Sequence, residues 1–406
     1  MTGNTDIDRA LTDAGNWLLS NRDKKAGGWA AIKGRSPSSL NTAEALLAIH
    51  QVQDWLPPVG GQVKSAAEFV KQQQTKEGPD AGAWFRYLDG KPRCPDLART
   101  SLAVEALIAL SGTEPPPAVA LGVRWLLSVR NSDGGWGYRS DVSSEVLPTC
   151  FAVSALLSVA AAEAEDCDSV IEKGLEFLVS RQRANGSFGA EDPLSGVRTA
   201  YAALCLQRGE RCRLRADRDA RDHAIAWLEA NPVPALREVE ETMEIDPDRD
   251  DPRADYTFLF MSEALVVRLL SESPDRQVRT GQLAREAMEA LYKAMASDGG
   301  FFGQRVYSWS TARAAYALAA ARRNFHTFPE AGRPTEPRKV GQVILFFLVL
   351  VLLSVVLLSL IGGFGAAQAS VFALLVLAAL VGYGVISETG FVQALRSVFS
   401  GGRGTP

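Results

Sequence analysis

A two-helix unit that recurs six times constrains the fold of this 406-residue chain more than any other feature. Each copy has a helical segment with an aromatic residue, a turn, and a second helical segment that begins near a threonine. The six threonines are separated by 49 to 58 residues, and they are Thr42, Thr100, Thr149, Thr199, Thr257 and Thr311. A repeat of this length is typical of folds in which similar helical units stack on one another.

Five of the six turns combine glycine with an aromatic residue. They are Gly28-Trp29, Gly82-Ala83-Trp84, Gly135-Trp136, Gly186-Ser187-Phe188 and Gly300-Phe301. Glycine permits the backbone angles that a tight turn needs, and the aromatic side chain must then pack against neighbouring helices. We find no convincing strand pattern before residue 338, so the sequence predicts twelve helices.

The two helices of a unit differ in composition, which indicates how the units are arranged. The second helices are rich in alanine, serine, threonine and small apolar residues, which suits close packing around a shared axis. The first helices carry one aromatic stripe and a charged outer face, as in 63–76 and 279–293. We therefore predict an all-α fold, an (α/α)6 toroid of six helical hairpins with an inner and an outer ring over residues 1–327.

Two of the repeats resemble a known family. The stretches GGWGYRSDVSSEVLPTCFAVSALL and DGGFFGQRVYSWSTARAAYALAAA look like the repeats shared by squalene–hopene-type terpene cyclases and protein prenyltransferase β subunits. The resemblance extends over about residues 6–325. It implies the toroid fold and a ligand of the isoprenoid class.

The C-terminal part has a different character. Residues 328–339 read as a linker with proline and arginine, and residues 340–387 contain no charged side chain. Two stretches within 340–387 are long enough to cross a bilayer, so we expect two transmembrane helices joined by a turn at 362–369. Residues 388–406 would form a short tail.

The charges beside these predicted spans indicate their orientation. Basic residues precede the first span and follow the second, at Arg333, Arg338, Lys339, Arg396 and Arg403. Because basic residues favour the cytoplasmic side, we expect a multi-pass membrane protein with its N-terminal domain and tail in the cytoplasm.

Repeat five replaces its glycine turn with an acidic insertion. Residues 238–255 hold nine carboxylates at the predicted start of an inner helix, near one mouth of the toroid. Three interpretations remain open: a carboxyl group kept neutral as an acid, a Mg²⁺ or Ca²⁺ site with oxygen ligands, or a solvated acidic loop.

The family resemblance narrows the candidate acids. The string Asp248-Arg249-Asp250-Asp251 matches the DxDD signature of cyclases that protonate an alkene or epoxide, but Asp251 lies six residues before Thr257. In the family, the last aspartates directly precede the threonine position. Asp255, two residues before Thr257, is therefore the best acid candidate, helped by Asp250 or Asp251.

A zinc-dependent prenyl transfer has less support. Asp96 fits the family's Asp-x-Cys segment, but Ala98 stands in place of the cysteine, and the three histidines do not suit a cavity ligand. We therefore expect no zinc site, and the open metal interpretation stays Mg²⁺ or Ca²⁺ at 238–255.

Aromatic residues near the starts of the inner helices are candidates for ligand binding. An aromatic-lined cavity can hold an apolar chain or stabilise a carbocation, and an arginine after a turn can meet a phosphate. The candidates are Phe151, Tyr201, Tyr256, Tyr307, Trp309 and Arg305.

The net charge of −4 and the lack of basic runs argue against nucleic-acid binding. Two functions remain. The first is a membrane-anchored protein that binds an isoprenoid or similar lipid in the toroid, with acid-initiated cyclisation as its chemistry if it is an enzyme. The second is a non-catalytic, membrane-tethered scaffold that binds a protein partner.

Overall fold

The computed structural model describes residues 3–31, 36–88, 91–111, 114–140, 142–162, 167–189, 195–214, 216–231, 262–273, 281–301 and 308–324. The chain divides into two compact units, Met1–Pro334 and Thr335–Pro406, and all described residues lie in the first. The expected spans within 340–387 and the tail 388–406 therefore fall outside the described residues. Within the described ranges, no helix combines the length and the apolar character that a bilayer crossing requires.

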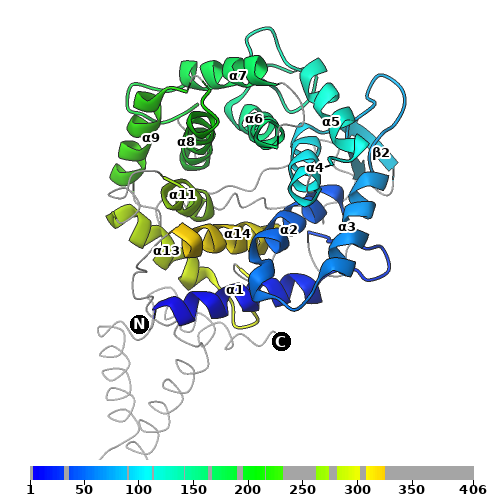
Figure 1. Cartoon of the computed structure of the whole chain (residues 1–406). Coiled ribbons are helices and arrows are strands. Elements are labelled where there is room, and N and C mark those ends of the chain that lie inside the picture. Colours follow the sequence, from blue (N-terminus) through cyan, green and yellow to red (C-terminus); the bar gives the residue numbers. More distant parts are fainter. Residues whose placement is uncertain are drawn as a thin grey trace, which may run out of the picture. The chain divides into compact units, whose positions relative to one another are not determined.

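Twelve α-helices in the described residues form two concentric rings (Figure 1). The inner ring consists of α2 (Ser39–Val52), α4 (Leu97–Leu110), α6 (Val146–Ala161), α8 (Ser195–Arg211), α11 (Ser262–Ser271) and α14 (Ser308–Asn324). The outer ring consists of α1 (Gly3–Ser20), α3 (Gly60–Gln72), α5 (Pro117–Ser128), α7 (Asp168–Ser180), α9 (Arg218–Ala230) and α13 (Gln282–Ala294). A short 3₁₀ helix, η1 (Gln53–Trp55), follows α2. The helical toroid predicted from the repeats is confirmed.

The ring is closed. Each inner helix contacts the next along the chain, and the last one, α14, contacts the first, α2. The outer helix α1 also contacts α14, so the sixth repeat packs against the first as its neighbours do. Because the units close on themselves, neither end of the array exposes the apolar face that an open stack must cap.

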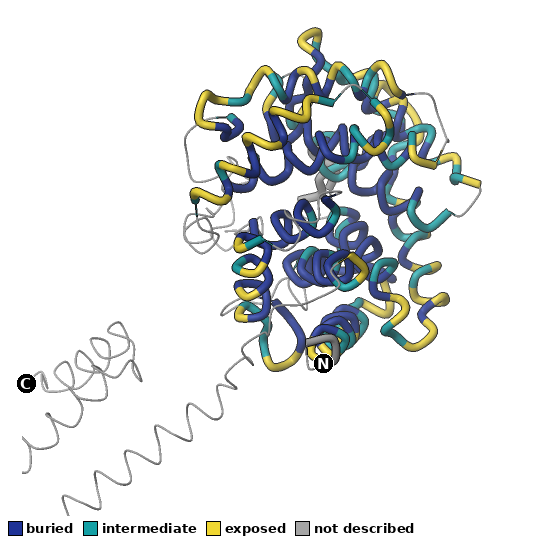
Figure 2. The backbone as a smooth tube through the Cα atoms, turned by 60° about the vertical axis from the view of Figure 1, so that its left-hand side comes forward, coloured by how far each residue is buried: buried dark blue, intermediate teal, exposed yellow. Residues whose placement is uncertain are grey.

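Burial follows the two rings (Figure 2). The inner helices are buried on nearly all sides, because they pack against both their inner neighbours and the outer ring. The outer helices bury one stripe, such as Val119, Val123 and Leu126 in α5, and expose the other side. The small residues of the inner helices allow this close packing, as predicted from their composition.

The glycine turn and the threonine of each repeat are joined by one hydrogen bond. In five repeats the threonine hydroxyl oxygen accepts the backbone N–H of the turn aromatic at 3.0 Å. The pairs are Trp29–Thr42, Trp84–Thr100, Trp136–Thr149, Phe188–Thr199 and Phe301–Thr311. In addition, the indoles of Trp29, Trp84 and Trp136 donate to backbone carbonyls of their own outer helices at 2.7 to 2.8 Å. The turn aromatic therefore holds the two helices of a hairpin together.

A glycine in each of these turns also fixes the contact with the next repeat. Gly27, Gly82, Gly134, Gly186 and Gly299 all have φ between +87° and +101°. A Cβ atom on Gly82 would lie 2.1 Å from the Leu121 carbonyl oxygen of the next outer helix. On Gly299 it would lie 2.4 Å from the Asp13 carbonyl oxygen in α1, so the same contact closes the ring. Only glycine satisfies both the backbone angle and this approach.

One element was not predicted. The loop before α4 contains an antiparallel hairpin of β1 (Phe85–Leu88) and β2 (Lys91–Pro95), so the expectation of no strand before residue 338 was wrong. The strands are short, one carries two prolines, and the pairing is irregular between Arg86 and Tyr87, which explains why no alternating pattern is visible in the sequence.

Candidate functional site

The centre of the toroid holds a small pocket that is lined by charged and aromatic side chains of the inner helices. Its volume is about 40 Å³. Five inner helices provide its polar lining, through Glu44 of α2, Glu105 of α4, Tyr201 of α8, Arg268 of α11, and Arg313 and Tyr316 of α14. The remaining lining is apolar, from Leu47, Leu102, Ala264, Leu265 and Ala312.

An ion pair joins the first and last inner helices at this pocket. The Arg313 guanidinium donates two hydrogen bonds to Glu44 Oε1, at 2.8 and 2.9 Å. The Glu44 side chain is only 6% exposed, and burial raises its pKa even though Arg313 acts to lower it. The short contact favours the ionised carboxylate, but the loss of water around it is the larger effect.

A second ion pair joins α4 and α8 across the intervening inner helix α6. Arg208 of α8 approaches Glu105 of α4 at 3.3 Å and donates to Ser154 Oγ at 2.5 Å and to Ser158 Oγ at 2.8 Å, both of α6. Burial alone would lower the pKa of Arg208, but Glu105 raises it and the net shift is upward. Three inner helices are thus tied together by one guanidinium, whose side chain is 18% exposed.

Arg268, the other arginine that lines the pocket beside Arg313, has a different environment. The Arg268 guanidinium carbon lies 3.9 Å from the centre of the Tyr316 ring, in a cation–π contact. Its Nε is 3.6 Å from Glu272 Oε1, beyond hydrogen-bond distance, and this buried Nε has no hydrogen-bond partner in the part of the chain that the structure describes. Burial acts to lower its pKa, but Tyr316 and Glu272 raise it, so the group stays charged.

Three of the predicted ligand-binding residues can be placed. Tyr201 lines the pocket, and its ring packs edge-on against Phe151 with centroids 5.4 Å apart. Trp309 is buried, 5.7 Å from the Arg313 guanidinium, and like Phe151 it is not among the lining side chains. The other candidates, Tyr256, Tyr307 and Arg305, and all four candidate acids, Asp248, Asp250, Asp251 and Asp255, lie outside the described residues.

The sequence analysis missed the charged lining, although the repeats contain a signal for it. Seven pocket residues lie two or five positions after a repeat threonine: Glu44, Leu47, Leu102, Glu105, Tyr201, Arg313 and Tyr316. Positions two and five after a helical residue share one face with each other because they are three apart. Reading these positions across the six repeats would have identified the side chains that face the centre.

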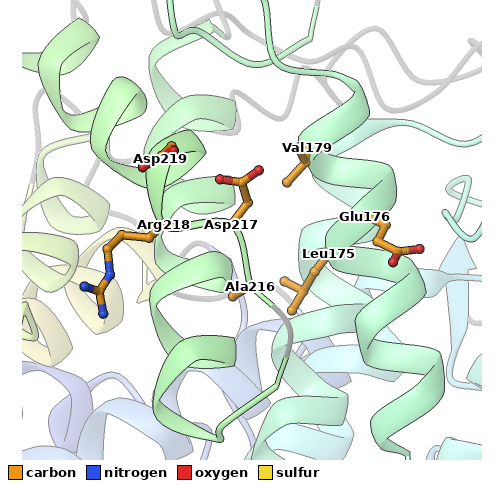
Figure 3. Close-up of a pocket in the computed structure, with 7 residues that line it drawn as sticks. All are labelled: Leu175, Glu176, Val179, Ala216, Asp217, Arg218 and Asp219. Carbon is orange, nitrogen blue, oxygen red and sulfur yellow. The ribbon is translucent and has the colours of Figure 1, made fainter.

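A larger groove of about 490 Å³ lies on the outer surface between α7 and the start of α9 (Figure 3). Leu175 and Val179 form its apolar part, and Asp217 and Arg218 lie at its rim. These polar residues already have structural roles, because Asp217 accepts the Ala220 N–H as the N-cap of α9 and Arg218 pairs with Glu210. We therefore place the candidate site in the centre of the ring.

In the described ranges, no group of three or more histidine, cysteine, aspartate or glutamate side chains has the arrangement of a metal site. The segment 238–255, where Mg²⁺ was expected, lies outside these ranges.

Residues 38–197 match the family model of the squalene-hopene cyclase C-terminal domain. The drimenyl diphosphate synthase of Streptomyces showdoensis is 25% identical over 189 residues, 47% of this chain and 34% of that protein. Lanosterol synthase ERG7 of Saccharomyces cerevisiae is 29% identical over 143 residues, 32% of this chain and 18% of that protein. The chain thus spans about a third or less of the length of these relatives.

Two solved structures share the architecture at low identity. The type II terpene cyclase MstE from Scytonema, in complex with geranylgeranyl dihydroxybenzoate, aligns with a TM-score of 0.54 at 16% identity and covers 79% of this chain and 99% of its own. The α-1,6-mannanase GH76A of Salegentibacter aligns with a TM-score of 0.54 at 11% identity, over 79% of this chain and 100% of its own. Such likeness shows the fold alone, and the fold serves unrelated chemistries. Together with the family-model match over residues 38–197, it confirms the resemblance that the repeats carry: the toroid of this chain is similar to that of terpene cyclases.

Proposed function

We propose that the protein binds an isoprenoid in the centre of the toroid, next to a membrane to which residues 340–387 tether it. One observation carries the proposal: the inner helices of a terpene cyclase-like toroid converge on a pocket that combines tyrosine rings, aliphatic side chains and a buried arginine. Aliphatic and aromatic walls suit a prenyl chain, and a few polar groups would orient it. The relatives point to the same ligand class, since drimenyl diphosphate and geranylgeranyl dihydroxybenzoate are named for two of them.

The pocket must widen to accept such a ligand. Its present 40 Å³ is close to the space of one water molecule, whereas pockets for small organic ligands hold about 300–1,000 Å³. Arg268 and Tyr316 meet through a stacking contact, without a hydrogen bond between them. We expect these two side chains to move together when the ligand enters, because no side-chain hydrogen bond ties either of them to another inner helix in the described residues.

In this proposal, Asp255 is the catalytic acid. Both carboxylates that line the described pocket, Glu44 and Glu105, are hydrogen-bonded to other inner helices and serve to hold the ring together. Asp255, with Asp250 or Asp251, would supply the proton for an acid-initiated cyclisation. Mg²⁺ at 238–255 belongs to the same proposal, as does a cytoplasmic position for the toroid.

The test is native mass spectrometry of the detergent-purified full chain with geranylgeraniol, combined with extraction of lipids that co-purify. A bound prenyl species is expected in the wild type, and less of it in Ala312→Leu, because Ala312 lines the pocket. Ala106→Leu is the matched control, since Ala106 is equally buried on α4 but does not line the pocket.

Two further comparisons complete this test. In Asp255→Asn, the ratio of acyclic to cyclic prenyl species is expected to rise if Asp255 is the acid. Binding of bulk bilayer lipid alone, unchanged in Ala312→Leu, would contradict the isoprenoid proposal.

A non-catalytic scaffold is the second candidate. The small volume and the two ion pairs across the inner ring favour it, because such a centre leaves little room for a reaction. Crosslinking and affinity purification of the full chain would then recover the same protein partner from the wild type and from Asp255→Asn, with no prenyl species bound.

A further inference from the structure

Arg268 is a largely buried cation, with a side chain 16% exposed, whose hydrogen-bonding capacity is not used in the described part of the chain. A guanidinium carries five N–H donors in a planar fork, and taking it out of water is costly unless acceptors replace the water. Two other arginines of the inner helices, Arg313 and Arg208, each donate to a carboxylate of another inner helix. Arg268 makes only the stacking contact with Tyr316 and the 3.6 Å approach to Glu272 in the described part of the chain.

Glu272 does not satisfy the hydrogen-bond donors of Arg268. Its other carboxylate oxygen, Oε2, lies 3.2 Å from Arg211 and accepts a hydrogen bond from that side chain. One carboxylate is therefore shared between two arginines, and the closer contact goes to Arg211 rather than to the guanidinium in the pocket. The site keeps an excess of donors at Arg268.

The position of Arg268 places these donors at the central pocket. The side chain lines the pocket together with Tyr201, Tyr316 and the aliphatic residues Leu102 and Leu265. Its guanidinium carbon lies 3.9 Å from the centre of the Tyr316 ring, and this contact uses none of its N–H donors in a hydrogen bond. Stacking on an aromatic ring is also how proteins fix an arginine fork for planar, two-point recognition of an anion.

We propose that Arg268 binds the anionic end of the ligand, a carboxylate or a phosphate group, and thereby selects acidic isoprenoids over neutral ones. This inference rests on the proposed function, since it assumes that a prenyl chain enters the same pocket. The aliphatic and tyrosine walls contact the chain, and the fork of Arg268 donates hydrogen bonds to two oxygens of the acidic group. Arg268 is then the residue that determines specificity.

The experiment compares three probes that share one C20 chain: geranylgeraniol, geranylgeranoic acid and geranylgeranyl diphosphate. Their affinities for the full chain in detergent are measured by native mass spectrometry or tryptophan fluorescence, for the wild type, Arg268→Gln and Arg268→Lys. Arg124→Gln is the control, because Arg124 is an exposed arginine of the outer helix α5. Thermal unfolding of each variant checks that it is folded.

We expect the wild type to bind the acid or the diphosphate about tenfold or more tighter than the alcohol, since hydrogen bonds to a charged group have that magnitude. Arg268→Gln should remove this preference and leave the affinity for the alcohol within about twofold, and Arg268→Lys should retain part of it because the charge persists without the fork. The relative affinities for acid and diphosphate identify which anion the fork fits.

The failures are distinguishable. If the wild type binds the three probes equally, or if folded Arg268→Gln and Arg268→Lys both keep the full preference, the role of Arg268 is wrong while isoprenoid binding stands. If the wild type binds none of the probes, the proposed function fails, and the inference with it.

Discussion

Single side chains decide how each hairpin holds together, and the repeat threonine is the clearest case. Its hydroxyl is buried and accepts the N–H of the turn aromatic with the same 3.0 Å distance in five repeats. The sequence shows both residues in every such repeat but gives no reason for their association. The reason is an otherwise unsatisfied N–H at a turn that the aromatic ring pulls into the core.

Thr149→Val keeps the shape of the side chain and removes this acceptor. Because the Trp136 N–H would then be buried without a partner, we expect a loss of about 1–3 kcal/mol in the free energy of unfolding, measured by urea denaturation. Thr75→Val is the control, since the Thr75 side chain is only partly buried and makes no corresponding bond to a turn aromatic. Equal effects of the two substitutions would contradict the assigned role.

Arg313→Met tests the ion pair between Arg313 and Glu44 at the central pocket. It leaves Glu44 buried without its partner, which should cost about 3–5 kcal/mol at neutral pH. Burial already raises the pKa of Glu44, and loss of Arg313 raises it further. A carboxyl group with a raised pKa in the folded state loses stability as the pH rises from its unfolded value near 4.5 through the folded value. The cost of Arg313→Met should therefore shrink toward pH 4.5.

Urea denaturation of the wild type and Arg313→Met between pH 4.5 and 8 measures this trend. The double variant Glu44→Gln, Arg313→Met should recover most of the lost stability, because it removes both charges. A cost that does not change with pH would show that Glu44 is not the group responsible.

The hairpin and its turn form the next level, where the positive-φ glycines fix the distance between repeats. Five equivalent glycines pack their Cα atoms against the following outer helix, four of them with a backbone carbonyl as the nearest obstacle to a Cβ atom. The sequence predicted glycine for its conformational freedom alone. The contact with the next repeat adds a second requirement that no single hairpin reveals.

The chain offers a matched pair to separate these two requirements. Gly82 and Gly78 both have positive φ, +101° and +82°, but a Cβ atom on Gly78 meets nothing within 4 Å, whereas on Gly82 it meets the Leu121 carbonyl. Both alanine variants bear the cost of the backbone angle, about 1–2 kcal/mol. Gly82→Ala should lose about 1–3 kcal/mol more, from overpacking, in chemical denaturation. Similar losses for both would mean that the neighbouring helix yields easily.

At the scale of the whole molecule, the sequence allows the number and the kind of repeat units to be predicted. Six repeats with small-residue inner helices sufficed to predict a two-ring toroid, because periodicity and composition are local properties. The ion pairs at the centre could not be predicted in the same way. Glu44 and Arg313 are brought together only by closure of the ring, and Glu105 and Arg208 only by the packing of three inner helices.

The ring is also closed by contacts at its rim, which gives a further prediction. Arg322, near the end of α14, donates to Asp8 of α1 at 2.7 Å and holds the pKa of Asp8 below its usual value. Such a carboxylate stabilises the fold above its unfolded pKa near 3.8, and the contribution is lost as the pH falls through the lower folded value. Asp8→Asn should therefore cost up to about 1 kcal/mol at neutral pH, since the pair is partly exposed, and less in acid.

Urea denaturation between pH 3 and 7 would measure this effect. Glu289→Gln on α13 removes one carboxylate of an exposed pair within a single helix, and it should change the stability less. If Glu289→Gln has the larger effect, the contact at the ring junction stabilises the fold no more than an exposed ion pair within one helix does.

The same contact between Asp8 and Arg322 places the start and the end of the toroid next to each other. A folded unit whose two ends meet can be spliced into a surface loop of another protein without stretching either chain. It can equally be cut between two repeats and rejoined at the native ends, because the glycine contact between repeats six and one resembles those at the four other described junctions. The closed ring of inner helices thus gives no repeat a structurally distinct end position.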